Sequence, residues 1–191
     1  MRPLTLYTML ILAYCVGLRL GEIIALKLGD VDLSEQSIEV RDSKFFKSRR
    51  LPLSSTAMAA VRDYLNARAQ SSAASDPSTS LFSVKKGRRY VGAGAALRRL
   101  IRLAGLNNQT GRGGPTIHDL RHTFVVHRMT AWYRAGINPQ GRLPYLAAYL
   151  GHRNIHSTLV YLTITQDLLQ HASERFRTAE AEVLKKIQGE R

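Results

Sequence analysis

Three segments in the second half of the sequence carry side chains that could act together on a phosphodiester. They are His118-Asp119-Leu120-Arg121-His122, Leu150-Gly151-His152 and Tyr161. A tyrosine hydroxyl is a nucleophile, an arginine holds negative charge on nonbridging oxygens, and histidines transfer protons. Attack by tyrosine on phosphorus forms a covalent intermediate that stores the bond energy, so rejoining would need no nucleotide cofactor.

The charge balance of the chain indicates the class of partner. Among 191 residues there are 28 Lys+Arg and 14 Asp+Glu, which gives a net charge of +14. Such an excess is typical of proteins that bind a polyanion, most often nucleic acid, although a basic surface that only confers solubility is an alternative. Because Cys15 is the single cysteine, an internal disulfide and a cysteine-based zinc cluster are excluded, and a cytoplasmic location is favoured. The apolar stretch 4–18 is too short to span a membrane.

Apolar periodicity and turn residues predict an α+β fold that is mostly α-helical, with one small antiparallel β-hairpin. The hairpin is expected to pair residues 37–40 with 50–53. Polar or glycine-rich loops are expected at 70–79, 107–115 and 136–143. Helices are expected at 4–14, 20–26, 55–69, 94–104, 117–133, 144–150 and 167–187.

Two earlier segments complete an ordered set of five motifs. They are Gly17-Leu18-Arg19-Leu20-Gly21-Glu22 at a helix start and the hairpin segment 43–53, which begins Ser43-Lys44-Phe45. In this order the motifs resemble those of the catalytic domain of the tyrosine recombinase (phage integrase) family. The resemblance covers residues 4–169, nearly the whole chain. A separate N-terminal domain that clamps DNA is expected to be absent, so residues 1–191 are interpreted as a catalytic domain alone.

The resemblance implies a role for each residue of the set. Arg19 and Arg121 would stabilise the charge on the phosphate, and Glu22 would support Arg19 from behind. Tyr161, nine positions after His152, would be the nucleophile. His118 and His152 would assist proton transfer or orientation. Lys44 would protonate the leaving 5′-oxygen, with Lys47 as the alternative because the glycine that usually lies near the family lysine is missing.

The resemblance also implies the reaction, which is site-specific cleavage and rejoining of DNA through a 3′-phosphotyrosyl intermediate without metal or cofactor. The interval of 31 positions from Arg121 to His152 is similar to that of recombinases from transposons and integrative elements. The alternatives are a type IB topoisomerase, which the Leu-Gly-His motif disfavours, and a non-catalytic basic DNA-binding protein. His118 and His122 could also face one metal ion, but the pattern offers no third ligand.

Double-stranded DNA is therefore the expected partner. Lys47, Arg49 and Arg50 flank the hairpin and are predicted to follow the DNA backbone. The tail 167–187 has an apolar stripe with helical spacing. It could fold back on its own domain, or dock in a neighbouring protomer of a tetramer on DNA, as the resemblance implies.

Overall fold

The structure of the protein is a computed structural model that describes residues 2–41, 48–71, 75–83, 89–106, 114–152, 154–161 and 173. The chain divides into two compact units. The first comprises Met1–Val125 with Ala148–Gly151, and the second comprises Val126–Ala147 with His152–Arg191. The predicted site residues are divided between them, because the arginines and His118 belong to the first unit, and His152 and Tyr161 to the second.

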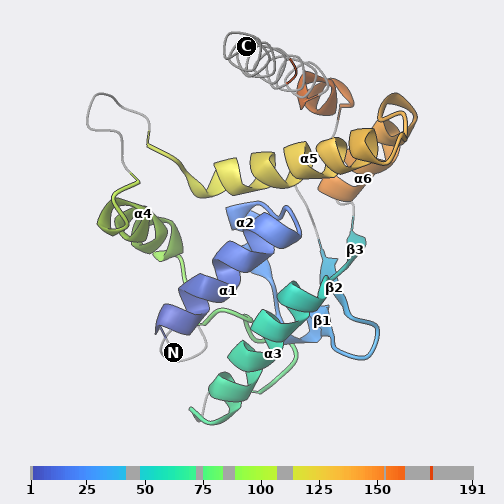
Figure 1. Ribbon diagram of the computed structural model, residues 1–191. Helices are drawn as coiled ribbons and strands as arrows, with labels where there is room; N and C mark the ends of the chain where they lie inside the picture. Colours follow the sequence, from blue (N-terminus) through green and yellow to red (C-terminus); the bar gives the residue numbers. More distant parts are fainter. Residues whose placement is uncertain are drawn as a thin grey trace, which may run out of the picture. The chain divides into compact units, whose positions relative to one another are not determined.

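Four helices of the first unit match predicted helices closely. Helix α1 (Arg2–Cys15) and helix α3 (Ser55–Ala69) lie side by side and pack against each other (Figure 1). Helix α2 (Leu20–Ala25) follows α1 after a short turn, and helix α4 (Ala93–Leu103) also packs on α1. The bounds of α3 agree with the prediction at both ends. At its start, the Ser54 side chain accepts a hydrogen bond from the backbone N–H of Ala57 and so caps the helix.

The sheet is antiparallel and has three strands, in the order β1 (Val31–Asp32), β2 (Ser37–Val40) and β3 (Arg49–Pro52). In the pairing of β2 with β3, Val40 lies opposite Arg49. The predicted mostly helical α+β fold with a small antiparallel hairpin is therefore confirmed. Strand β3 begins and ends one residue before the predicted strand 50–53, and this shift matters for the site.

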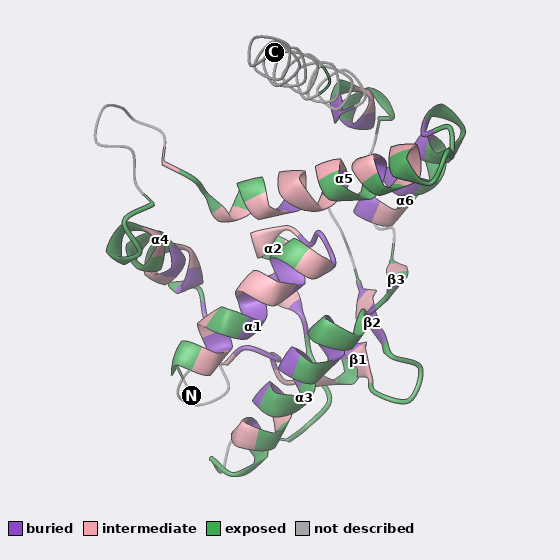
Figure 2. Cartoon of the chain, in the orientation of Figure 1, coloured by how far each residue is buried: buried purple, intermediate pink, exposed green. Residues whose placement is uncertain are grey.

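The core of the first unit lies between the sheet and the helices. Helices α1 and α3 each carry buried segments (Figure 2). Leu12 of α1, Ile38 of β2 and Tyr64 of α3 are fully buried. The hydroxyl of Tyr64 donates a 2.8 Å hydrogen bond to the carbonyl of Leu81, which satisfies its one polar group inside the core. The predicted interior is thus built from apolar faces at helical and strand spacing.

The prediction missed strand β1 and two short 3-10 turns, Leu28–Asp30 and Gln140–Arg142. These elements are too short to show periodicity, and contacts made elsewhere hold the first of the two turns. The buried carboxylate of Asp30 accepts a 2.8 Å bond from the Lys27 backbone N–H and a 2.7 Å bond from Nε of Arg41.

Two helices run through both units. Helix α5 (Ile117–Arg134) begins in the first unit, and helix α6 (Leu143–Leu150) ends there. The Asp119 side chain caps the start of α5: one of its carboxylate oxygens accepts from the backbone N–H and the hydroxyl of Thr116, at 2.6 and 2.9 Å. The Thr116 backbone N–H, followed by its hydroxyl, holds the pKa of Asp119 below its ordinary value despite an opposing contribution from burial.

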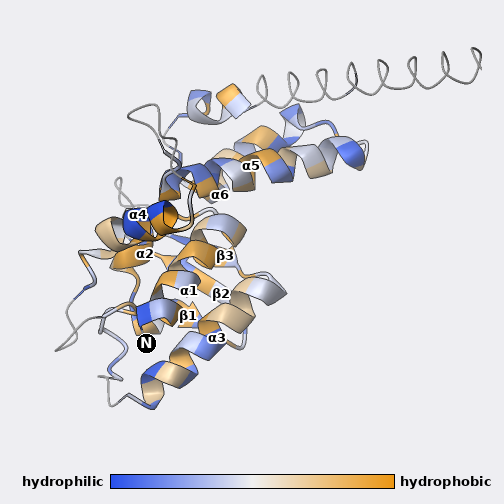
Figure 3. Ribbon diagram, turned by 60° about the vertical axis from the view of Figure 1, so that its left-hand side comes forward, coloured by the Kyte–Doolittle hydropathy of each residue, from blue (hydrophilic) through white to orange (hydrophobic). Residues whose placement is uncertain are grey.

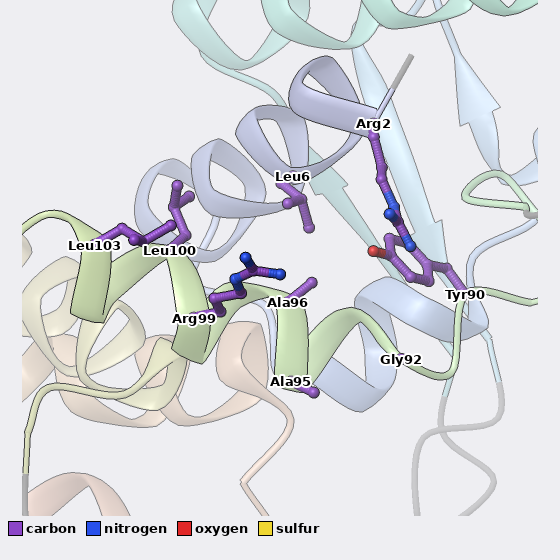
Figure 4. A pocket seen from close by; sticks show the side chains of 9 residues that line it. All are labelled: Arg2, Leu6, Tyr90, Gly92, Ala95, Ala96, Arg99, Leu100 and Leu103. Carbon is purple, nitrogen blue, oxygen red and sulfur yellow. The ribbon is translucent and has the colours of Figure 1, made fainter.

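The first unit also has a groove of about 470 Å³ between α1 and α4 (Figure 4). Helix α4 carries strongly hydrophilic and strongly hydrophobic residues, and its outer leucines contribute to this groove (Figure 3). The side chains that define it are Arg2, Leu6, Tyr90, Arg99, Leu100 and Leu103. None of these six belongs to the predicted catalytic set. Within the described residues, no helix has the length and apolar character needed to cross a membrane.

Candidate active site

Arg19 and Glu22 form one unit at the start of α2. Arg19 immediately precedes the helix, and its backbone N–H donates a 2.9 Å hydrogen bond to Oε2 of Glu22. Its guanidinium Nη1 also lies 3.0 Å from Oε1 of the same carboxylate. An acidic residue in the first turn compensates the unpaired N–H groups of a helix N-terminus. Local helix chemistry therefore places the Glu22 carboxylate against the Arg19 guanidinium.

Glu22 is surrounded by three guanidinium groups. Besides Arg19, Nη2 of Arg49 lies 3.0 Å from Oε1, and Nη1 of Arg121 lies 3.8 Å from Oε2. Only 9% of the Glu22 side chain is exposed, and this burial alone would raise its pKa. The Arg19 N–H and the positive charges of Arg49 and Arg19 outweigh burial, so the pKa of Glu22 lies below its ordinary value. Glu22 is thus a carboxylate at neutral pH.

Arg121 is held deep in the first unit by two carbonyl groups. Its side chain is 1% exposed, and Nη1 donates a 2.6 Å bond to the carbonyl of Gly17. Nη2 donates a 2.7 Å bond to the carbonyl of Leu150, to which Nη1 of Arg19 also donates, at 3.2 Å. The two arginines predicted to hold phosphate therefore converge on one oxygen. The Arg19 side chain is 37% exposed, which makes it the more accessible of the two.

Two glycines allow the chain to approach this cluster. Gly17 has a φ of +71°, and a Cβ atom there would lie 2.7 Å from the ring of Phe124. Gly151 has a φ of +64°, and a Cβ atom there would lie 2.8 Å from Nη1 of Arg49. Both positions favour glycine because L side chains rarely adopt this backbone conformation. The glycine in each motif is thus explained by a helix end and by a close neighbour.

His118 lies on the first turn of α5, and its ring contacts that of His122 edge to face, with centroids 4.5 Å apart. Burial is the largest influence on its pKa and lowers it, and the charges of His122, Arg121 and Arg19 lower it further, against the opposing charge of Asp119. His118 is therefore neutral at pH 7 and can accept a proton. In the described part of the chain, no group of three His, Cys, Asp or Glu side chains could hold a metal ion.

The second unit places His152 just after Gly151. Its Nδ1 lies 2.7 Å from the hydroxyl of Thr158, which is fully buried, and this hydrogen bond fixes the orientation of the imidazole ring. Tyr161 ends the described helical segment 156–161 and is only 4% exposed. Lys44 and Lys47 lie outside the described residues, as does all of the predicted tail helix 167–187 except Ser173.

The arrangement of Arg49 is the main feature that the sequence analysis missed. The structure places its guanidinium inside the cluster, with 11% of the side chain exposed, whereas Arg50 next to it is exposed. A signal was present, because residues two apart on a strand share a face. Arg49 is two residues before Leu51, which is buried. The DNA contacts predicted for Arg49 and Arg50 stay a prediction.

The model of the phage integrase family matches residues 1–167, which include all five motifs. The chain belongs to the phage integrase family. Among integrase relatives, a putative integrase/recombinase, y4rB, of Sinorhizobium fredii is 40% identical over 92% of this chain and 56% of its own length. A tyrosine recombinase XerC of Herpetosiphon aurantiacus is 34% identical over 83% of this chain and 48% of its own length. The chain thus spans about half the length of these integrase-family relatives.

Solved structures of integrase-like proteins have the same fold. The crystal structure of XerA recombinase covers 92% of this chain and 59% of its own, with a TM-score of 0.69 and 25% identity. The integrase of transposon Tn1549, solved in complex with transposon right end DNA, covers 81% of this chain and 53% of its own. Its TM-score is 0.60 at 22% identity, so it supports the integrase fold alone.

Proposed function

We propose that this chain is the catalytic domain of a site-specific recombinase that cleaves and rejoins double-stranded DNA, serving a mobile genetic element. The observation that carries this proposal is the arrangement of three guanidinium groups around the single carboxylate of Glu22. This excess of fixed positive charge suits a phosphodiester that gathers negative charge in its transition state. Membership of the phage integrase family supports the same conclusion.

In the proposed reaction, the Tyr161 hydroxyl attacks phosphorus and forms a 3′-phosphotyrosyl bond. The bond from phosphorus to the 5′-oxygen breaks, and Lys44 protonates that oxygen. Arg19 and Arg121 stabilise the charge on the nonbridging oxygens. The tyrosyl proton passes to a neutral imidazole, a role that the lowered pKa of His118 suits, while the hydrogen bond to Thr158 orients His152. Rejoining reverses these steps and needs no nucleotide cofactor.

The proposal extends to the partners of the chain. A net charge of +14 supports binding to double-stranded DNA, with Lys47 and Arg50 as candidate contacts to its backbone. The apolar stripe of the tail 167–187 supports assembly of a tetramer on DNA.

The test is covalent capture of DNA by the full chain. A library of nicked duplexes with randomised arms beside the nick is incubated with the protein, and adducts that survive denaturing detergent are isolated and sequenced. We expect an adduct with one enriched sequence from wild type, and none above background from Tyr161→Phe. Tyr145→Phe is the matched control, because Tyr145 is 72% exposed and lies outside the proposed site, and it should retain the adduct.

Two outcomes would reject the proposed function. One is wild-type protein that retains DNA in a salt-sensitive manner but forms no adduct, as expected of a binding protein. The other is an equal adduct from Tyr161→Phe. An adduct without sequence enrichment, together with relaxation of supercoiled plasmid, would replace the recombinase with a topoisomerase.

A further inference from the structure

We infer that Arg49 is a positioning residue, which holds the Glu22 carboxylate and, through it, the Arg19 guanidinium in the geometry that receives the scissile phosphate. The inference rests on the proposed function and adds a residue outside the predicted catalytic set. It assigns to Arg49 a role different from the predicted contact with the DNA backbone.

The first support is the position of each guanidinium nitrogen of Arg49. Nε donates a 2.8 Å hydrogen bond to the carbonyl of Tyr149, near the end of α6, and Nη2 donates a 3.0 Å bond to Oε1 of Glu22. Nη1 is buried beside Gly151 and has no hydrogen-bond partner among the described residues. Two of the three nitrogens therefore bond to groups of the protein, the third is buried, and only 11% of the side chain is exposed.

The second support is the chemistry of the Glu22 carboxylate. Oε1 accepts from Nη2 of Arg49 and from Nη1 of Arg19, each at 3.0 Å, so the two guanidiniums share one oxygen. Oε2 accepts the backbone N–H of Arg19 at 2.9 Å and stays 3.8 Å from Arg121, beyond hydrogen-bond distance. Arg49 thus helps to hold the orientation of the carboxylate that fixes Arg19.

The third support is the requirement for arginine at this place. Arg49 is the first residue of β3, and its side chain bonds both to Glu22 on α2 and to the Tyr149 carbonyl on α6. The planar guanidinium can make both bonds at the same time because it presents several donors in a fixed fork. A lysine carries the same charge but is a point donor on a flexible stem. It could approach Glu22 or the Tyr149 carbonyl, but it would not reproduce the fixed angle between the two bonds.

The experiment measures the rate of adduct formation at saturating DNA, using a nicked duplex of the sequence selected by wild type. We expect Arg49→Gln to slow this rate by roughly 10- to 100-fold, because a small misplacement of a charged group has a large effect on a rate. The dissociation constant for DNA should change by less than about threefold. Arg49→Lys should recover part of the rate, and Arg62→Gln, which alters an exposed arginine on α3, should match wild type.

A double-mutant cycle with Glu22→Gln tests whether Arg49 acts through Glu22. If it does, Arg49→Gln should slow the Glu22→Gln protein by less than about threefold, because the group that Arg49 positions has already been altered. A role of Arg49 that does not pass through Glu22 would give additive losses instead of this non-additivity. Melting curves of every variant establish that the rates are compared between folded proteins.

Several results would overturn the inference while leaving the proposed function intact. One is a wild-type rate in Arg49→Gln, and another is fully additive losses of rate in the double mutant. A third is weaker DNA binding by Arg49→Gln with an unchanged rate at saturating DNA, which would assign Arg49 to a phosphate contact. If neither Arg49→Gln nor Arg49→Lys folds, the role of Arg49 is to stabilise the fold alone. If wild type itself forms no adduct, the inference and the proposed function fail together.

Discussion

At the scale of single residues, the site depends on one carboxylate placed among several positive charges. Glu22 offsets part of the repulsion between guanidinium groups that are 37%, 11% and 1% exposed, for Arg19, Arg49 and Arg121 respectively. A buried charge is tolerated only when opposite charges and hydrogen bonds replace its lost hydration. The same carboxylate therefore contributes to the stability of the first unit and to the geometry of the proposed catalytic groups.

We predict that Glu22→Gln lowers both stability and activity. Glutamine keeps the shape but removes the negative charge, so Arg49 and Arg121 lose the carboxylate that lies 3.0 and 3.8 Å from them. We expect a loss on the order of 3 kcal/mol in urea unfolding at neutral pH, and at least a tenfold slower rate of adduct formation. Glu35→Gln, which alters an exposed turn residue, should stay within about 0.5 kcal/mol of wild type. Equal stability of Glu22→Gln and wild type would contradict the prediction.

The pH dependence of the stability difference between wild type and Glu22→Gln follows from the lowered pKa of Glu22. Because the carboxylate is favoured in the folded state, its contribution is fully present above the ordinary pKa of a glutamate. It is lost as the pH falls through the lower pKa of the folded protein. The stability gap between wild type and Glu22→Gln should therefore be constant near neutrality and narrow in acid. Urea unfolding at a series of pH values measures this stability gap. A gap that widens in acid would contradict the lowered pKa of Glu22.

At the scale of elements, helix ends position most of the described site. Arg19 and Glu22 belong to the start of α2, His118 lies in the first turn of α5, and Gly151 follows the last residue of α6. Glycine is required at position 151 for two reasons. Its φ is +64°, and a Cβ atom added there would lie only 2.8 Å from Nη1 of Arg49. The end of α6 and the arginine cluster thus constrain each other.

We predict that Gly151→Ala destabilises the protein by on the order of 1–2 kcal/mol, since an L residue is disfavoured in the left-handed region. It should also slow adduct formation, because the added methyl group displaces Arg49. Gly21→Ala provides the matched control: Gly21 lies inside α2 with open space around it, so alanine should stabilise by about 0.5–1 kcal/mol. Thermal unfolding of the two variants measures both effects. A Gly151→Ala protein as stable as wild type would contradict the requirement for glycine at position 151.

The sequence contains much of this element-level information. Apolar periodicity predicts α3 with its bounds, and the motif order identifies Arg19, Glu22 and Arg121 as one set before any distance is known. Strand β1 could not be predicted, because its two residues are a strand only through pairing with β2. The inward position of Arg49 was also missed, because the charge of arginine favours a surface assignment. Only the distant partners Glu22 and Tyr149 reveal why it is buried.

At the scale of the whole molecule, the excess of 28 basic over 14 acidic residues exceeds what one catalytic cluster uses. Most of this charge is available for long-range attraction to DNA and for contacts with its backbone, which position the duplex without selecting its sequence. Affinity and sequence preference should therefore respond differently to ionic strength.

We predict that binding to a duplex of arbitrary sequence weakens steeply with salt. If six phosphates are neutralised, the dissociation constant should rise by roughly 10³-fold between about 50 and 200 mM NaCl. Arg50→Gln, which alters an exposed residue beside the hairpin, should reduce the slope of log K against log salt by about one. Fluorescence anisotropy measures both slopes. An affinity that does not change with salt would show that phosphate contacts are not the basis of binding.

The carbonyl oxygen of Leu150 has a consequence for how the site can change. It accepts hydrogen bonds from Arg19 at 3.2 Å and from Arg121 at 2.7 Å, so the proposed phosphate-binding arginines share an anchor at the end of α6. A shift of that anchor acts on both arginines, and neither can be retuned independently by moving it. A displacement of this carbonyl should therefore be felt by both arginines at once, while the Gly17 carbonyl still holds Arg121 and the Glu22 carboxylate still holds Arg19.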